Sequence, residues 1–335
     1  MRKRCPRSTP PSRSWSRGAD ARAGNQRIYK QRIRSTQTLQ KVFRAMELIA
    51  SSRIGSARHN AQEAGPYDHA LSQAVAAVGT HAALDHPLTR EREDTNRVAV
   101  LVLTSDRGMA GAYSATILRE TERLIEQLVA DGKEPVLFTY GRRASAYFAF
   151  RGRPVEFSWT GESDRPSDTS IEEVATVLLD YFLSSPEAGG VAEVHIVFTR
   201  YVSMVSQVPE VRRMLPLKVV DVDGPGELSR EDLAADVERV RAERTGARPL
   251  YEFSPSADAV LDALLTRYVR SRIRNALLQA AASELASRQQ AMHTATSNAE
   301  DLIATYTRLA NAARQGDITQ EITEIVSGAD ALGSQ

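Results

Sequence analysis

Apolar residues recur every seven positions through the early part of the chain. The repeat runs from Phe43 to Val78, and further apolar residues occupy the intervening turns. Such a repeat is typical of the seam of a coiled coil, so we expect a long helix over residues 25–84. About sixty helical residues would be about 90 Å long, which is longer than a single globular domain requires. The repeat consists of Phe43, Ala50, Ala57, Ala64, Leu71 and Val78.

A second seven-residue repeat runs through the C-terminal part of the chain. Its one charged interruption is Arg288, and a further apolar stripe continues beyond Gly316. Two such helices can bury each other's seams, so we expect residues 25–84 and 251–335 to form an antiparallel coiled coil. The second repeat consists of Leu278, Leu285, Met292, Ala299, Tyr306 and Ala313.

The region between the two repeats alternates short apolar runs with amphipathic segments. This alternation predicts an α/β domain over residues 85–220 with a doubly wound, mostly parallel sheet. The run Val98–Leu103 is continuously apolar, as expected of a strand that is buried on both faces. The other expected strands are Val136–Tyr140 and Val194–Phe198, with an edge element at Val208–Leu217, and the expected helices are Ser114–Ala130, Arg142–Phe150 and Thr169–Leu183.

Two segments have a polar composition that does not suit a core. Residues 1–24 are rich in Arg, Ser and Pro, so we expect a disordered basic tail. Residues 221–250 are charged and contain Gly224-Pro225-Gly226, which favours a linker or an exposed insert. No run approaches the roughly 18 apolar residues that a membrane span needs, so we expect membrane contact only through partners.

Charge is distributed unevenly, although the formal net charge of the chain is only +1. Between Met1 and Arg58 the only acidic residues are Asp20 and Glu47. A basic segment of this density favours an acidic partner, which can be a nucleic acid or a protein surface. Few aromatic residues lie between the basic ones, which disfavours nucleic acid and leaves an acidic protein face.

Residues 104–113 follow the first expected strand, where a nucleotide-binding fold places its phosphate loop. The segment contains neither the dinucleotide nor the P-loop glycine pattern, so a turn is the better interpretation. The six histidines show no metal-ligand spacing, and His195 is expected to be a hydrogen-bonded core residue. The chain has one cysteine, Cys5, and no serine-hydrolase motif. We therefore expect no catalytic, cofactor or metal site, and a nucleotide-binding α/β protein and a coiled-coil adaptor remain alternatives.

Three segments resemble the gamma subunits of bacterial F-type ATP synthases. These are the basic helical stretch Arg32–Arg53, the loop Ser105–Gly111, and Ala312–Ala329 near the C-terminus, in the same order as in that family. The resemblance extends over about residues 25–332. Ala110 and Ala112 stand where the family usually has Cys and Gly, and the N-terminal tail and the insert are additional.

The resemblance implies a non-catalytic, rotating central stalk. Such a stalk would couple ion flow through the membrane ring to ATP synthesis or hydrolysis at the beta subunits, and would help regulate ATPase activity. The implied partners are the alpha and beta subunits, the epsilon subunit and the ring of c subunits. The implied location is peripheral, on the cytoplasmic face of the bacterial cell membrane. The positions that match beta-subunit contacts are Met46, Arg314, Gln315, Thr319, Gln320 and Glu321, while Lys41 and Arg44 would face an acidic stator loop.

Overall fold

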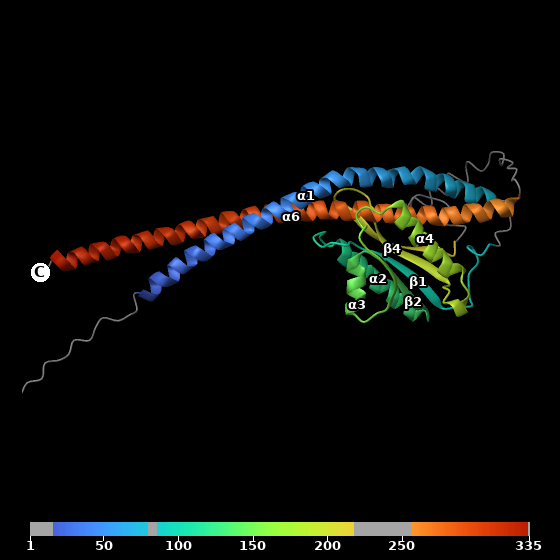
Figure 1. Cartoon of the computed structure of the whole chain (residues 1–335), viewed down its shortest axis with the longest axis horizontal. Helices are drawn as coiled ribbons and strands as arrows, with labels where there is room; N and C mark the ends of the chain where they lie inside the picture. The colour runs from blue at the N-terminus through green and yellow to red at the C-terminus, as the bar shows by residue number, and fades with distance from the viewer. Residues whose placement is uncertain (1–15, 80–85, 218–255, 334–335) are drawn as a thin grey trace, which may run out of the picture. The chain divides into compact units, whose positions relative to one another are not determined.

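The computed structural model describes residues 16–79, 86–217 and 256–333, and side chains from residue 26 onward (Figure 1). The chain divides into two units. The coil unit comprises Met1–Glu47 and Met292–Gln335, and the sheet unit comprises Leu48–Ala291. Two long helices contribute to both units, α1 (Ser16–Gly79) and α6 (Ala257–Gly333).

Helix α1 begins before the predicted boundary. Residues 16–24, assigned from the sequence to a disordered tail, are helical. Six of these nine residues are Ala, Arg or Ser, and adding residues to an existing helix costs far less than nucleating a new one. Pro66 lies inside α1, which continues through it. Residues 1–15 and the charged segment 221–250 lie outside the described residues.

The described part of the sheet unit contains five strands in the order β3-β2-β1-β4-β5. Strands β1, β2, β3 and β4 run parallel to one another, and β5 pairs antiparallel with β4. The predicted doubly wound, mostly parallel sheet is therefore confirmed, while β3 was not predicted. The strands are β1 (Arg97–Leu103), β2 (Glu134–Tyr140), β3 (Val155–Trp159), β4 (Glu193–Tyr201) and β5 (Gln207–Leu215).

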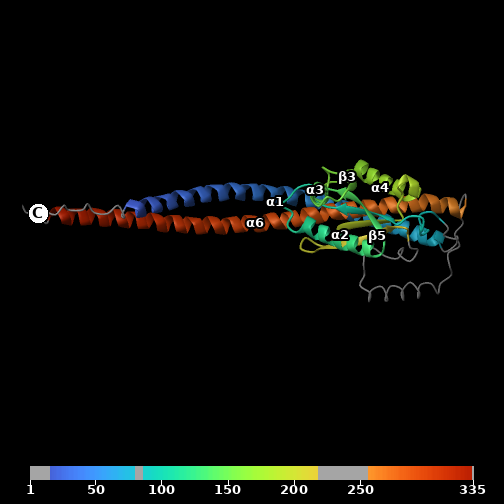
Figure 2. The same ribbon diagram turned by 90° about the horizontal axis from the view of Figure 1, so that it is seen from below.

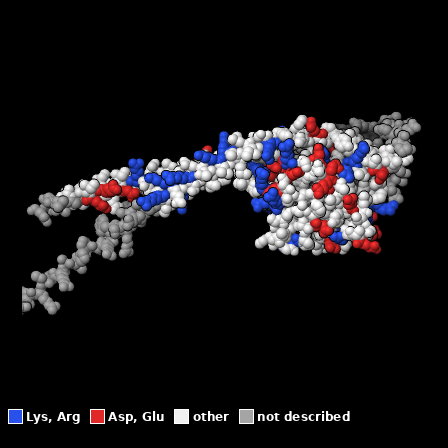
Figure 3. Space-filling model, in the orientation of Figure 1, with Lys and Arg blue, Asp and Glu red and all other residues white. Residues whose placement is uncertain are grey.

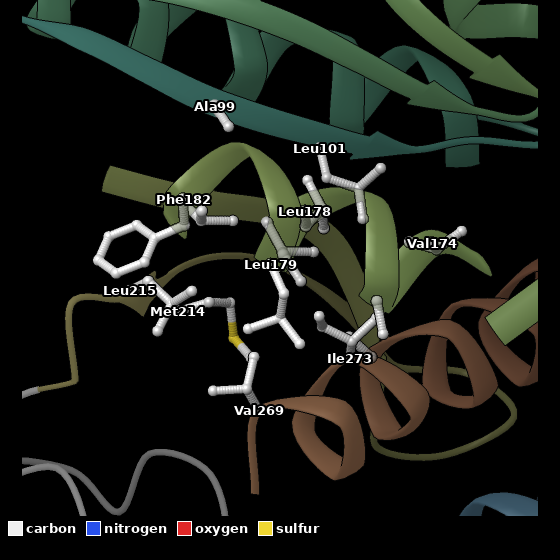
Figure 4. Packing of buried hydrophobic residues seen from close by; sticks show 14 of the residues in the cluster. Ala99, Leu101, Val174, Leu178, Leu179, Phe182, Met214, Leu215, Val269 and Ile273 are labelled. Carbon is white, nitrogen blue, oxygen red and sulfur yellow. The ribbon is translucent and has the colours of Figure 1, made fainter. Parts of the chain in front are cut away.

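Helices cover both faces of this sheet. Successive side chains of β1 point to opposite faces, so each set packs against different helices. Val98, Val100 and Val102 point into a core formed with α2 (Tyr113–Ala130) and α3 (Arg142–Phe150). The intervening residues of β1 face α4 (Asp168–Leu183) and α6, as Figure 4 shows for Ala99 and Leu101. A short 3-10 helix, η1 (Pro186–Ala188), precedes β4.

The N-terminal half of α6 belongs to the core of the sheet unit. Leu261, Leu265, Val269 and Ile273 lie four residues apart and are at most 3% exposed, and Figure 4 shows Val269 and Ile273 facing side chains of α4. The C-terminal helix expected over 251–335 is described from Ala257 to Gly333 as the single helix α6, and its N-terminal half also packs on the sheet. Residues 251–255 lie outside the description, and the first described turns of α6 pack on a sheet. A row spaced by four residues marks this second apolar face, beside the heptad row.

Candidate partner-binding surfaces

The coil unit has a thin apolar core. Figures 1 and 2 both show α1 and α6 running side by side in opposite directions here. Among the described residues of α6 from Met292 onward, only Met292, Ala299 and Ala310 are buried apolar residues, and none of residues 26–47 of α1 is buried. Small side chains allow two helices to approach closely, but each removes little apolar area from water. The coil unit therefore gains little stability from burial.

Specific contacts between the two helices set their register. The rings of Tyr29 and Tyr306 stack with centroids 6.4 Å apart, and the Arg32 guanidinium lies 5.6 Å from the Tyr306 centroid. The Gln40 side-chain amide donates to Glu300 Oε1 at 3.0 Å. These contacts join positions that only one alignment of the helices brings together. In a seam of small residues, such contacts specify the pairing more than the seam does.

The coil unit leaves large aliphatic side chains in contact with solvent. On α6, Ile318 and Ile322 are 44% and 56% exposed, and Ile325 is 72% exposed. Their spacing of three and four residues places them on one side of the helix. Others are exposed elsewhere in the unit: Ile28, Leu39, Val42, Leu302, Leu309 and Val326. Soluble proteins rarely leave large apolar side chains exposed close together, and such surface usually marks an interaction site.

The positions matched to beta-subunit contacts lie among these exposed residues. Gln315 and Thr319 are exposed on α6, one turn apart, and the Thr319 hydroxyl donates to the Gln315 carbonyl at 2.9 Å. Arg314 and Glu321 are also exposed, and Gln320 is half-buried. Figure 3 shows both acidic and basic groups on the face of the coil unit that is turned toward the viewer.

The remaining site residues lie on α1. Lys41 and Arg44 are exposed, and Met46 is half-buried. Arg44 pairs with Glu47 on the same helix at 3.5 Å. Among the described residues, no hydrogen bond or ion pair joins this α1 set to the α6 set, so the structure does not assemble them into one site.

The carboxyl edge of the sheet is closed by a carboxylate from the chain itself. Asp106 accepts hydrogen bonds from the backbone N–H groups of Arg142, Gly161 and Ser163, at 3.1, 2.8 and 3.0 Å. Burial alone would raise the pKa of Asp106, but these donors outweigh it and lower the pKa below its ordinary value. Gly141 has φ of 99°, and a Cβ there would lie 2.1 Å from the Thr104 carbonyl oxygen, so only glycine fits. The segment 104–113 thus supplies the carboxylate that joins the backbone at Arg142 to the loop at Gly161 and Ser163.

A buried ion pair on α6 lies beside this loop. Glu284 and Arg288, 1% and 6% exposed, pair at 2.6 Å, and Arg288 also donates to the Arg107 carbonyl at 3.4 Å. Burial raises the pKa of Glu284 to about 7, against the opposing effect of Arg288. In the sequence, Arg288 is visible only as an interruption of the seam, and its pairing with Glu284 was not predicted. A Glu four residues before an Arg within an apolar row was the available signal.

His195 has the predicted environment. It is 9% exposed in β4, and its Nε2 lies 2.8 Å from Glu193 Oε2. The hydrogen bond with His195 is the largest effect on the pKa of Glu193, which it lowers. Burial opposes this effect and Lys133 adds to it, and the pKa of Glu193 falls to about 2. His195 is therefore a hydrogen-bonded core residue, as predicted.

Comparison with known proteins decides the family. A family model described as ATP synthase matches residues 25–332. The ATP synthase gamma chain of Beutenbergia cavernae is 60% identical over 314 residues, covering 93% of this chain and 99% of that one. The gamma chain of Nocardioides sp. is 53% identical over 91% of this chain and 96% of its own length. The chain belongs to the ATP synthase gamma chain family.

Chains from solved ATP synthase structures share the fold. A chain of the Euglena gracilis mitochondrial ATP synthase (OSCP, F1 and c-ring) superimposes with a TM-score of 0.61 at 16% identity, covering 93% of this chain and 96% of that chain. A chain from the rotor of the same enzyme gives 0.56 at 16% identity, with 88% and 99% covered. As a gamma chain, the protein is the central stalk of an F-type ATP synthase. Among the described helices, none has the length and apolar character needed to span a bilayer.

Proposed function

We propose that this gamma chain turns inside a head of alpha and beta subunits and contacts the beta subunits through the exposed face of the coil unit. Catalysis resides in the beta subunits, and the chain itself takes no cofactor. Its other partners are the epsilon subunit and the ring of c subunits, and it acts on the cytoplasmic face of a bacterial cell membrane, which it contacts only through partners. The single supporting observation is the exposed α6 face, where Gln315 and Thr319 alternate with Ile318 and Ile322.

The polar residues of this face carry the coupling. Arg314, Gln315, Thr319, Gln320 and Glu321 can reach a beta-subunit loop without burying a charge, because all are exposed or half-buried in the isolated chain. Hydrogen bonds that involve a charged group contribute about 1.5–3 kcal/mol each. If they form in one rotary state and break in the next, they change the relative energies of the states. Lys41 and Arg44 on α1 would face an acidic loop of the stator, and Met46 would contact the beta subunit near that loop.

The test replaces Arg314 and Gln315 together with Ala in the assembled complex. We expect ATP hydrolysis to fall by about tenfold or more, because each 1.4 kcal/mol added to the rate-limiting barrier costs about a factor of ten. The matched control is Arg123→Ala on α2, whose side chain is 67% exposed and pairs only locally with Glu120. Circular dichroism of the isolated chain should be unchanged in both variants. Wild-type turnover in a fully assembled double variant would contradict the proposal.

A further inference from the structure

The turn between β4 and β5 is rigid and anchored to α6. The Ser203 hydroxyl accepts from the N–H groups of Val205 and Ser206, at 3.3 and 3.0 Å. The Gln207 side-chain amide donates to the carbonyls of Ser203 and Met204, both at 2.9 Å. Its oxygen accepts from the Ser287 hydroxyl of α6 at 3.1 Å. The turn is therefore ordered before any partner arrives.

This rigid turn has an inner and an outer side. Met204 and Tyr201 pack inward on a small cluster that includes Ile54 of α1 and Leu285 of α6. Val202 and Val205 point outward, with 51% and 78% of their surface exposed. Because five side-chain hydrogen bonds already order the turn that carries these two valines, little further conformational entropy is lost when a partner covers them.

A groove of about 540 Å³ lies beside the valines. One wall is α1 between Arg58 and Gly65, and the other is the turn from Tyr201 to Val205. Arg58 is the only charged residue of the lining. Its guanidinium lies 5.8 Å from the Tyr201 ring centroid, and within the described part of the chain it has no carboxylate partner. An occupant that complements this surface is apolar and brings one carboxylate.

We propose that this groove docks an apolar protein segment carrying a carboxylate, supplied by another subunit of the same assembly. The aliphatic side chains of the segment cover Val202 and Val205, and its carboxylate meets Arg58. Val202 and Val205 line the groove and are 51% and 78% exposed, so its apolar surface is open to solvent, which favours a protein segment over an enclosed small molecule. The inference rests on the proposed function only in requiring that the chain assembles with other subunits.

Two glycines of α1 provide a matched steric test. At both Gly65 and Gly55, a Cβ would meet no atom within 4 Å apart from the neighbouring residues in the chain, so both positions open onto free space. Gly65 lines the groove and Gly55 does not. Gly55→Leu removes a poor helix former, whereas Leu at position 65 would precede Pro66, whose ring disfavours the helical conformation of a preceding residue with a Cβ. The two variants are therefore compared only where circular dichroism shows that both retain the helicity of the wild-type chain. Gly65→Leu fills the groove, and Gly55→Leu is its control.

The experiment places the photo-crosslinker p-benzoylphenylalanine at position 205 in the purified, assembled ATP synthase and maps adducts by mass spectrometry. We expect one adduct with a segment of another subunit that combines aliphatic residues with Asp or Glu. Arg58→Glu should lower its yield by about tenfold, because like charges would then face each other. Gly65→Leu should lower it similarly, and Gly55→Leu should not. The crosslinker at Val129, 57% exposed on α2, reports on non-specific reaction.

Several outcomes would overturn the inference. These are an intact complex without an adduct, an adduct insensitive to both Arg58→Glu and Gly65→Leu, and an adduct only with a second copy of this chain. Subunit composition, measured on a native gel, separates this failure from failure of the proposed function. A chain that never co-purifies with alpha and beta subunits would refute both, whereas an assembled complex with an unreactive groove refutes only the docking site.

Discussion

The sheet unit and the coil unit are built from similar residues but use them differently. In the sheet unit, aliphatic side chains of β1 are at most 1% exposed and are covered by helices on both sides. In the coil unit, Ile318, Ile322 and Ile325 of α6 are 44–72% exposed, and only a few of the described side chains are buried. Apolar residues thus stabilise the fold in one unit and offer a surface to partners in the other. The difference separates folding from assembly within one chain.

The largest expected effect tests the buried ion pair of the sheet unit. Arg288→Met leaves Glu284 buried without its cation, which should lower the free energy of unfolding by about 3–5 kcal/mol. The double variant Arg288→Met/Glu284→Leu should recover most of this loss, because it removes both charges. Urea denaturation of the isolated chain measures both. A double variant as unstable as the single one would mean that the pair is not the unit of interaction.

The same pair predicts how stability depends on pH. The pKa of Glu284 is raised from 4.5 to about 7 in the folded chain, so the folded state holds a proton that the unfolded state releases. Stability should therefore fall as pH rises from about 4.5 to about 7. The double variant should lack this component, and the difference between the two denaturation midpoints across that range measures it.

A matched pair of aliphatic truncations sharpens the comparison between the units. Leu101→Ala in β1, where the side chain is fully buried, should cost about 2–5 kcal/mol. Ile322→Ala in the coil unit should change the stability of the isolated chain by less than about 0.5 kcal/mol, because its side chain is 56% exposed. Thermal unfolding of the isolated chain compares the two. Equal losses would show that the coil unit depends on that isoleucine for folding.

The smallest expected effect concerns the register of the coil unit. A double-mutant cycle with Tyr29→Ala and Tyr306→Ala should give a coupling energy of about 0.5–1.5 kcal/mol, the usual range for an aromatic pair. Helicity at 222 nm during thermal melting supplies the measurement. The control cycle pairs Tyr29→Ala with Thr307→Ala, because Thr307 bonds only to the Ile303 carbonyl of its own helix. Coupling no larger than in the control would contradict a register role for the stack.

Much of the fold follows from local pattern. The run Val98–Leu103 predicts a strand that is buried on both faces, because such a strand shows no alternation of apolar and polar residues. Strand β3 was missed because it is a short edge strand whose middle residues are exposed, so Glu156 and Ser158 interrupt the apolar signal. The role of early α6 was missed because its row with a spacing of four overlaps the heptad row. Both patterns lie on one helix, and only the tertiary structure shows which neighbour covers each.

The site was less predictable than the fold. An apolar stripe from Ile318 onward was visible in the sequence, but its exposure was not, because exposure depends on what α1 can cover. The contact roles of Arg314, Gln315 and Thr319 come from family resemblance. The partners proposed for them lie on other chains, so neither pattern nor burial within this chain can test these roles. The rigid turn at Ser203 escaped notice because its order comes from side-chain hydrogen bonds that join distant segments.

Asp106 has one more consequence. Its side chain fills a cradle of three converging N–H groups, from Arg142, Gly161 and Ser163. Cutting the residue back to glycine would leave that cradle intact but vacant, with the size and polarity of a small carboxylate. Formate or acetate added to the solution could then enter and replace the missing group, so a chain damaged at this position would be open to chemical rescue. The backbone N–H groups that now bind the carboxylate of Asp106 would then bind a free carboxylate from solution.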